Sequence, residues 1–239
     1  MTGFLLIDKP ADWTSHDAVA YLRRTIRQAL GIKKIKIGHA GTLDPFATGL
    51  LIIGVGKEAT KQLSHYQRLP KVYEATITLG ATSDTQDGTG IINETVPQPT
   101  PPTKEQIEQT LVSFLGEQEQ LPPMYSAKKI QGKKLYELAR TGQEIERKPH
   151  HITIYRLERI AYQWPELSFR AEVSSGTYIR TLAHDIGATL GVGAYCKTLR
   201  RTSTGPYRVQ DAIAPTDITQ ENWQERLIPG INAAADAET

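Results

Sequence analysis

One aspartate in a glycine-rich loop is the residue in this chain best placed to do chemistry. Asp44 belongs to the stretch Ile37–Gly56, IGHAGTLDPFATGLLIIGVG. Apolar residues flank a central segment of glycines and a proline, which predicts a strand, an exposed loop and a buried strand. A carboxylate in such a loop could act as a nucleophile or a general base without a cofactor. Composition alone favours a plain structural turn, since Asp-Pro and glycine are ordinary turn residues.

Several standard sites are absent from the sequence. It contains no phosphate-binding GxxxxGK[ST], no GxGxxG opening a helix after a strand, no GxSxG elbow and no histidine pair spaced for zinc. Asp84 and Asp87 raise the question of a cation site, but their spacing does not fit a calcium-binding loop. Asp44 is thus the main candidate, and in a dry pocket it would need a cation to stay ionised.

A second group of candidate residues lies in SSGTYIRTLAHDIGATLG, residues 174–191. Thr177 is expected to cap a helix, with Tyr178 and Arg180 near its first turn. A cation there is unfavourable beside the positive end of the helix dipole, which indicates that Arg180 pairs with an acid from elsewhere. Tyr73, on an alternating strand expected over 72–79, is most simply explained by core packing.

Composition bounds the class of protein. The chain has 239 residues, a net charge of +2 and one cysteine, Cys196. A single cysteine excludes an internal disulfide and suits a reducing cytoplasm, where we expect the protein to act. No secretory signal is visible at the N-terminus, and no apolar run has the ~20 residues that span a bilayer. Because the net charge is near zero, any affinity for nucleic acid must come from local clusters.

Two such basic clusters occur. The first covers exposed positions of the expected first helix and the residues after it, and is either a solvated helix surface or a phosphate-binding patch. It comprises Arg23, Arg24, Arg27, Lys33, Lys34 and Lys36. The second is either a surface helix with i,i+4 charge pairs or an arm that closes on a polyanion. The excess of basic over acidic residues favours the arm, whose cations are Lys128, Lys129, Lys133, Lys134, Arg140, Arg147 and Lys148.

Periodicity predicts an α+β fold with a largely antiparallel sheet, because strands and helices do not alternate regularly. Expected helices run from Thr14 or Ser15 to Gly31, from Glu58 to Tyr66, from a Thr103–Gln106 capping box to Gly116, and onward from Thr177. Expected strands are 4–7, 72–79, 152–160, 167–173 and the closing GPYRV, with a loop over 80–90.

Six ordered segments resemble the TruB family of tRNA pseudouridine synthases, and together they cover almost the whole chain. The longest is GHAGTLDPFATGLL, residues 38–51; the others are LLIDKP, KVYEATITLG, MYSAKKIQGKKLYELAR, SGTYIRTLAHDIG and LRRTSTGPY. The resemblance implies a pseudouridine-synthase fold: a mixed, largely antiparallel central sheet flanked by helices. It also implies an inserted basic RNA-clasping arm at about residues 124–150.

The resemblance also implies roles for individual residues. Asp44 matches the catalytic aspartate, Tyr73 the tyrosine that stacks on the target base, and Arg180 the arginine that pairs with the aspartate. Tyr178 matches a tyrosine of the active-site pocket, and His39 matches a histidine that helps to take the target nucleotide out of its stack. Pocket or supporting positions of the family are matched by Lys9, Lys61 and Leu199.

The implied reaction converts uridine to pseudouridine at position 55 in the T-arm of tRNA, after base flipping. The implied partner is that stem-loop, with no metal, cofactor or membrane, and we expect a monomer without an obligatory protein partner. One alternative is a tRNA-binding folding helper in which catalysis is secondary or lost, and a folding role could also accompany catalysis. The other is a subunit of a guide-RNA-dependent complex.

The sequence departs from the family pattern in two places. Only some thirty residues follow Tyr207, so we expect a catalytic domain over 1–207 and a short extension over 208–239 without a complete PUA-like domain. Ser174 and Ser175 stand where many members have Cys-Lys, which removes a positive charge beside the loop.

Overall fold

The computed structural model describes residues 2–125, 129–130, 133–134 and 147–230. The chain forms two compact units, each with its own packing. Unit 1 comprises residues 1–71 and 200–239, and unit 2 comprises residues 72–199. Among the described residues, no helix is both long and apolar enough to cross a membrane.

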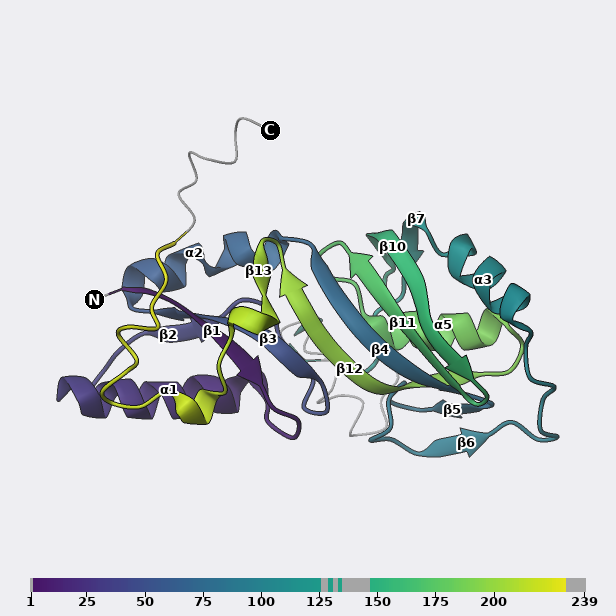
Figure 1. Ribbon diagram of the computed structural model, residues 1–239, viewed down its shortest axis with the longest axis horizontal. Coiled ribbons are helices and arrows are strands. Elements are labelled where there is room, and N and C mark those ends of the chain that lie inside the picture. Colours follow the sequence, from purple (N-terminus) through teal and green to yellow (C-terminus); the bar gives the residue numbers. More distant parts are fainter. Residues whose placement is uncertain (1, 126–128, 131–132, 135–146, 231–239) are drawn as a thin grey trace. The chain divides into compact units, whose positions relative to one another are not determined.

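Unit 1 is built on two almost fully buried strands with a helix on either side (Figure 1). The side chains of the strands alternate between the two helices. Strand β1 (Gly3–Lys9) pairs antiparallel with β3 (Thr48–Val55). On one side α1 (Ser15–Leu30) packs on Leu5, Ile7, Leu51 and Ile53. On the other side α2 (Lys57–Arg68) packs on Phe4, Leu6, Leu50 and Ile52. Because both sides of the strands are covered, β3 is one continuous apolar run.

The other edge of β3 has two neighbours. Strand β2 (Ile37–His39) pairs antiparallel with its far end, and β12 (Ala194–Thr204) runs parallel to its beginning, with Arg201 opposite Gly49. Gly49 has φ +105°, and a Cβ atom there would lie 2.3 Å from the carbonyl oxygen of Arg201. Only glycine permits both the backbone angle and this close approach of two strands.

The C-terminal segment packs onto unit 1. It starts with β13 (Tyr207–Arg208), which pairs with the end of β12, and continues through the short 3-10 helices η1 (Val209–Asp211) and η2 (Pro215–Asp217). Trp223 is 1% exposed and joins the cluster beneath α1, while Ile228 bridges to Phe4. The segment thus supplies part of the core of unit 1.

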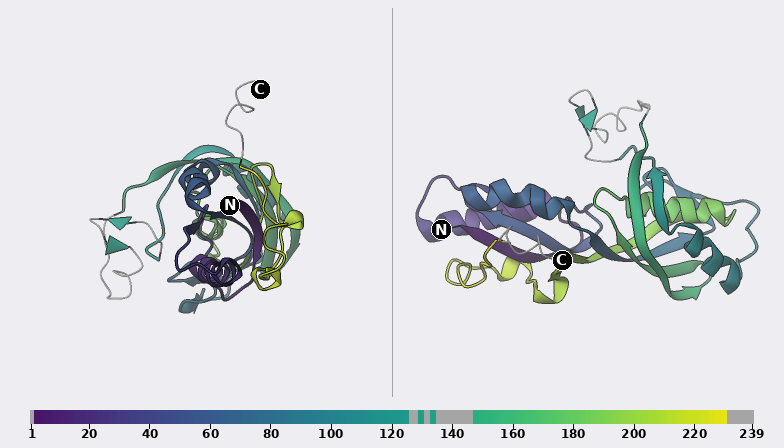
Figure 2. Two further views of the ribbon diagram at one scale, coloured as in Figure 1. Left: turned by 90° about the vertical axis from the view of Figure 1, so that its left-hand side faces the viewer. Right: turned by 90° about the horizontal axis from the view of Figure 1, so that it is seen from above.

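Unit 2 contains a sheet in the order β12, β4 (Lys71–Leu79), β11 (Glu166–Val173), β10 (His150–Gln163) and β7 (Gly116–Gln120). Its helices are α3 (Lys104–Ser113) and α5 (Ile179–Thr189). Two small hairpins complete the described part: β5 (Ala81–Ser83) with β6 (Ile92–Glu94), and β8 (Lys129–Ile130) with β9 (Lys133–Lys134). Among the described residues, β8 and β9 form a two-stranded sheet of their own. Figure 2 shows the ribbon from two further directions.

The α+β prediction with a largely antiparallel, mixed sheet is confirmed. Helix α1 lies where its signals predict it, with a reciprocal capping box between Thr14 and Asp17 and a left-handed Gly31 at its end. Helix α3 has the predicted box between Thr103 and Gln106 but ends at Ser113, before Gly116. The predicted hairpin of β10 and β11 is also confirmed.

Three local predictions need correction, and two strands were not predicted. The expected loop 80–90 contains strand β5, and β7 and the long β12 were not predicted. The polar GEQEQ of β7 has no apolar alternation because β7 lies beside β10 at the end of the sheet order. Part of the helix that was one interpretation of 128–148 is extended instead, as β8 and β9. The cap of α5 is Tyr178, without a side-chain cap, because Thr177 Oγ1 donates to the carbonyl of Ser174.

Candidate active site

The loop that carries Asp44 is held by hydrogen bonds on both sides of that residue. Before it, the Leu43 N–H donates to Ser15 Oγ at 2.9 Å, at the start of α1. After it, the Asp12 N–H donates to the Pro45 carbonyl at 2.9 Å, and the Ala47 N–H donates to the Asp44 carbonyl at 3.1 Å. The loop is therefore rigid while the Asp44 side chain stays half-buried, which suits a reactive carboxylate.

Lys9, the last residue of β1, is a buried cation that contacts the Asp44 loop. Its ammonium donates to the carbonyls of Pro10 at 2.8 Å, Trp13 at 2.6 Å and Pro45 at 3.2 Å. Burial lowers the pKa of Lys9 to about 8, and the negative charge of Asp44 opposes that shift. The resemblance implied a pocket or supporting role for Lys9, and in the structure it lies next to the Asp44 loop.

Arg201 is a supporting residue that sequence reasoning missed. Its side chain is 1% exposed; Nε donates to the Leu50 carbonyl at 2.7 Å and Nη2 to the Gly41 carbonyl at 3.1 Å. It therefore ties the two flanks of the Asp44 loop together. The segment LRRTSTGPY contains it, but adjacent arginines in a sequence do not tell which one turns inward.

His39 and Lys61 lie in different surroundings in unit 1. His39 ends β2, and its pKa is lowered by burial, by Arg201 and by His16, which favours the neutral imidazole. Lys61 lies on the exposed side of α2 and forms an ion pair with Glu58 at 2.9 Å. Its polar contacts among the described residues are those with Glu58.

In unit 2, Arg180 is a buried hub at the start of α5. Its Nη1 lies 3.3 Å from an oxygen of Asp87, and both side chains are almost fully buried. Nη1 also donates to the carbonyl of Thr85 at 2.7 Å, and Nη2 donates to that of Tyr125 at 2.8 Å. The expectation that Arg180 pairs with an acid from elsewhere in the chain is confirmed with Asp87. The pairing of Arg180 with Asp44, implied by the resemblance, stays a prediction.

Asp87 is the second residue that sequence reasoning missed, since it was considered only as a cation ligand. Its Oδ1 accepts from Thr85 Oγ1 at 2.8 Å and from the Thr89 N–H at 2.9 Å, which leaves Oδ2 for Arg180. Among the described residues, no group of three or more His, Cys, Asp or Glu side chains is arranged to hold a metal ion.

Tyr178 is held by its backbone. The buried side chain of Gln120 accepts from the Tyr178 N–H at 2.8 Å and donates to its carbonyl at 3.0 Å. The ring of His150 meets that of Tyr178 edge-on, with 6.0 Å between centroids. Gln120 thus fixes the start of α5 and, with it, the position of Arg180 two residues later.

Tyr73 and Leu199 are buried strand residues of unit 2, at 8% and 7% exposure. Core packing, which the alternation of β4 favoured for Tyr73, agrees with this burial. For the basic arm, the backbone of Lys129, Lys133 and Lys134 forms the β8–β9 hairpin, while Lys128 and Arg140 lie outside the described residues. At the arm's ends, Arg147 Nη1 donates to the Pro122 carbonyl at 2.9 Å.

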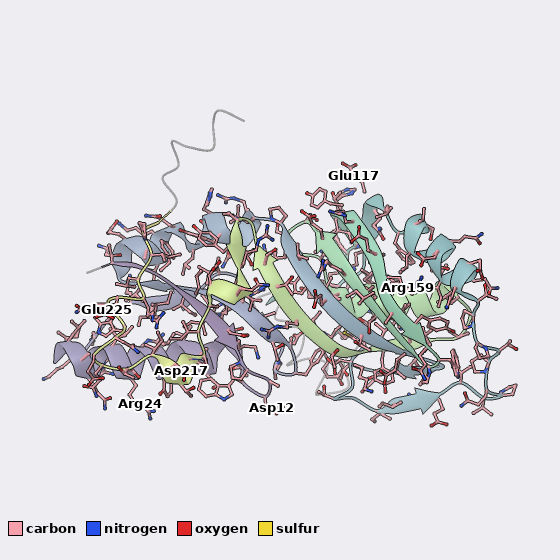
Figure 3. The ribbon with its side chains drawn as sticks, in the orientation of Figure 1. Asp12, Arg24, Glu117, Arg159, Asp217 and Glu225 are labelled. Atoms are coloured by element: carbon pink, nitrogen blue, oxygen red, sulfur yellow. The ribbon has the colours of Figure 1, made fainter. Side chains whose placement is uncertain are left out.

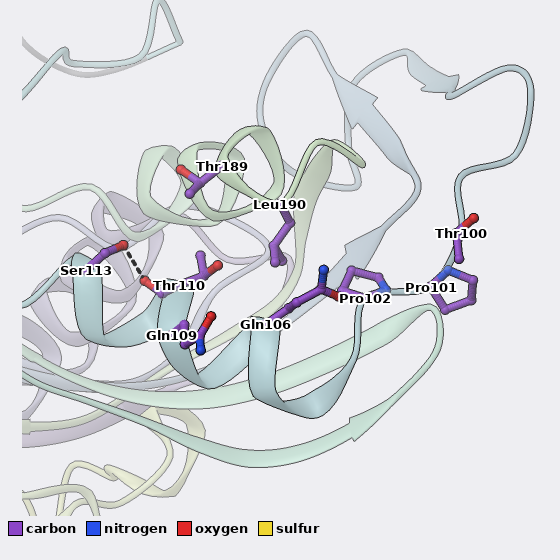
Figure 4. A pocket seen from close by; sticks show the side chains of 9 residues that line it. All are labelled: Thr100, Pro101, Pro102, Gln106, Gln109, Thr110, Ser113, Thr189 and Leu190. Carbon is purple, nitrogen blue, oxygen red and sulfur yellow. Dashed lines mark hydrogen bonds between the residues drawn. The ribbon is translucent and has the colours of Figure 1, made fainter.

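A separate pocket of about 380 Å³ opens in unit 2 beside α3 and α5 (Figure 4). Hydroxyl, amide, proline and leucine side chains line it, and none of these lining residues carries a charge; they are Thr100, Pro101, Pro102, Gln106, Gln109, Thr110, Ser113, Thr189 and Leu190. This set offers neither an acid, a base nor a nucleophile of lowered pKa, so it is not the candidate active site.

The fold matches that of solved structures. A chain in the crystal structure of a Cbf5–Nop10–Gar1 complex superposes with a TM-score of 0.69 and is 29% identical; the match covers 93% of this chain and 56% of that one. The fold is that of the pseudouridine synthases, a class of RNA-modifying isomerases.

Family models and curated relatives narrow this class. Residues 27–179 match the N-terminal domain of TruB family pseudouridylate synthases, and residues 180–229 match the C-terminal domain of tRNA pseudouridylate synthase B. The chain belongs to the TruB family. A tRNA pseudouridine synthase B of Opitutus terrae is 44% identical over 98% of this chain and 95% of its own length. One of Phocaeicola vulgatus is 45% identical over 95% of this chain and 96% of its own length.

Proposed function

We propose that this protein converts uridine to pseudouridine at position 55 in the T-arm of tRNA, with Asp44 as the catalytic residue. The observation that carries the proposal is the 44% identity to a tRNA pseudouridine synthase B across 98% of this chain and 95% of the relative. The built loop around Asp44 agrees with it, because a catalytic carboxylate must be held in place by groups that do not themselves react.

The reaction is an isomerisation and needs no net transfer of atoms. The bond between C1′ and N1 breaks, the detached uracil rotates, and C5 bonds to C1′; the proton then leaves C5 and N1 gains one. Asp44 starts it either by attack on C1′ or by removal of a sugar proton. Lys9, buried against the loop and attracted by the charge of Asp44, favours the ionised carboxylate that both routes require.

The uridine must leave its stack to reach Asp44, at a cost of about a few kcal/mol. Tyr73 is proposed to stack on the flipped base, which contributes roughly 1–3 kcal/mol per stacked base. Arg180 is proposed to pair with Asp44 while Asp87 holds its guanidinium from the other side. The basic segment around the β8–β9 hairpin is proposed to clasp the RNA, as an insertion within the catalytic domain over 1–207.

Pseudouridine mapping on an unmodified tRNA transcript tests the proposal. Wild type should modify position 55, and Asp44→Asn should reduce the rate by at least about 1,000-fold, as expected for a group that reacts. Asp12→Asn is the matched control: Asp12 is exposed, lies one hydrogen bond from the same loop, and has a φ of 64° that asparagine tolerates. No modification by wild type would refute the activity, and unchanged modification by Asp44→Asn would refute the role of Asp44.

A guide-dependent activity is the second candidate, because the Cbf5–Nop10–Gar1 chain shares the fold at 29% identity. The higher identity to tRNA pseudouridine synthases B of nearly equal length favours the guide-independent reaction. Purified protein incubated with a T-arm hairpin alone decides between them. Modification without guide RNA supports the proposed function, and a strict requirement for guide RNA contradicts it.

A further inference from the structure

A basic groove lies on unit 1, outside the residues assigned to catalysis. It has a volume of about 420 Å³ and is formed by the second half of α1 and the segment that follows it. Five of its six lining residues are cationic: Arg23, Arg27, Lys33, Lys34, Ile35 and Lys36. We call this set the α1 groove. It collects on one surface most of the first basic cluster of the sequence, whereas Arg24 lies elsewhere.

Among the residues that the structure describes, no acidic side chain forms an ion pair with a cation of the α1 groove. The sequence holds no Asp or Glu between Asp17 and Asp44, and none of the ion pairs among the described residues includes a groove cation. Arg23 is held in place, since its Nη2 donates to the carbonyl of Ile37 at 3.1 Å. Five convergent like charges repel one another in the free protein, and a bound polyanion relieves that repulsion. A surface that is merely solvated would instead mix the two signs.

The α1 groove also lies within reach of an RNA that enters the active site. Ser15, at the start of α1, bonds to Leu43 beside Asp44, whereas Arg23 and Arg27 lie eight and twelve residues further along the same helix. At 1.5 Å per residue the groove begins about 12–18 Å from the Asp44 loop. At roughly 3.4 Å of rise per phosphate along one strand, that span corresponds to about four or five nucleotides.

We propose that the α1 groove binds the phosphate backbone of the same RNA whose uridine reaches Asp44. The inference rests on the proposed function for the identity of that RNA. The contact is independent of base identity, because flexible lysines and an arginine cluster recognise phosphate charge. It adds a fixed cationic surface in unit 1 to the basic arm of unit 2.

The test is equilibrium binding of an unmodified tRNA transcript, measured by fluorescence anisotropy at KCl concentrations from about 0.05 to 0.3 M. The variant Arg27→Gln/Lys33→Gln/Lys34→Gln removes three groove charges. Each lost phosphate contact lowers the slope of log Kd against log salt by roughly 0.7–0.9, so we expect a decrease of about 2 and a Kd about 10-fold higher at 0.1 M. A second variant, Lys33→Gln/Lys34→Gln, changes only exposed side chains after the helix, so it tests the same point if the triple variant is unstable.

Arg24→Gln is the matched control. Arg24 lies on the same helix but lines a different hollow with Thr216 and Glu221, beside the segment that carries Asp217 (Figure 3). It removes one charge from α1 without touching the groove, so its salt slope should equal that of wild type. Folded groove variants with the slope of wild type would overturn the inference.

Modification of the same transcript is measured in parallel with binding. A wild-type protein that binds the transcript but does not modify it refutes the proposed function, whereas the inference about the α1 groove is tested by the salt slopes alone.

Discussion

The guanidinium of Arg180 lies 3.3 Å from the carboxylate of Asp87, and both side chains are buried in unit 2. This pair joins the start of α5 to the loop after β5, which are 93 residues apart in the chain. Through the carbonyl of Tyr125, Arg180 also contacts the segment from which the basic arm departs. Within unit 2, Arg180 is thus held by Asp87 and by the carbonyls of Thr85 and Tyr125.

Replacement of Asp87 should therefore destabilise the protein and slow modification together. Asp87→Ala removes a buried carboxylate from the guanidinium of Arg180, which we expect to cost about 1–3 kcal/mol. Urea unfolding measures the loss, and tritium release from labelled uridine in tRNA measures the rate. Asp84→Asn is the control on the same loop; Asp84 is exposed and asparagine keeps an oxygen for the Ile91 N–H, so its stability should change by less than about 0.5 kcal/mol. Equal stability of both variants would contradict the role of Asp87.

Gln120 should act as a positioning residue for Tyr178. Gln120→Leu removes both hydrogen bonds to the Tyr178 backbone, although the Tyr178 carbonyl keeps the bond from the Leu182 N–H. We expect a loss of about 1–3 kcal/mol in total. We expect a lower kcat with a smaller change in KM, because the start of α5 shifts rather than an RNA contact. Glu119→Ala, on the exposed side of the same strand, should leave both constants unchanged. A Gln120→Leu enzyme that is destabilised but turns over normally would limit Gln120 to folding.

The buried charge of Lys9 predicts a pH dependence of stability. Burial lowers its pKa from 10.5 to about 8 in the folded state, so between these values the unfolded chain binds more protons. Stability contributed by Lys9 should then rise as pH increases from about 8 to 10.5, by on the order of 1–3 kcal/mol. The measurement is the difference in unfolding free energy between wild type and Lys9→Met across this range. Lys71, whose pKa is also about 8, is present in both proteins and cancels from the difference. A difference that is constant with pH would refute the prediction.

Two glycines with positive φ should respond very differently to alanine. At Gly49 a new Cβ would meet the backbone of Arg201 at 2.3 Å, whereas at Gly31 nothing lies within 4 Å. Gly31→Ala should cost about 1–2 kcal/mol, the conformational penalty alone. Gly49→Ala must also separate β3 from β12, and we expect a loss above about 4 kcal/mol, which is exceptional for a point mutation. Thermal unfolding of the two variants measures the difference in stability. Similar melting temperatures would contradict the prediction, because they would show that β12 can move away from β3 at little cost.

The sequence by itself determined the local elements and the family. Helix α1 begins at a capping box and ends at a left-handed glycine, and each of these signals acts within four residues of chain. The motif around Asp44 likewise lies in one short stretch, so it could be recognised without a structure. Strand β7 could not be predicted from the sequence, because its residues are polar and do not alternate with apolar ones. It is stabilised by pairing with β10.

Only the tertiary structure decided which polar side chains turn inward. Arg201 reaches Gly41 across 160 residues, Gln120 reaches Tyr178 across 58, and Asp87 pairs with Arg180 from elsewhere in the chain. The sequence does not distinguish a buried aspartate from a solvated one, because both can have similar neighbours in the chain. What separates them is the cost of leaving a polar group unpaired away from water, and that cost depends on partners brought close by folding.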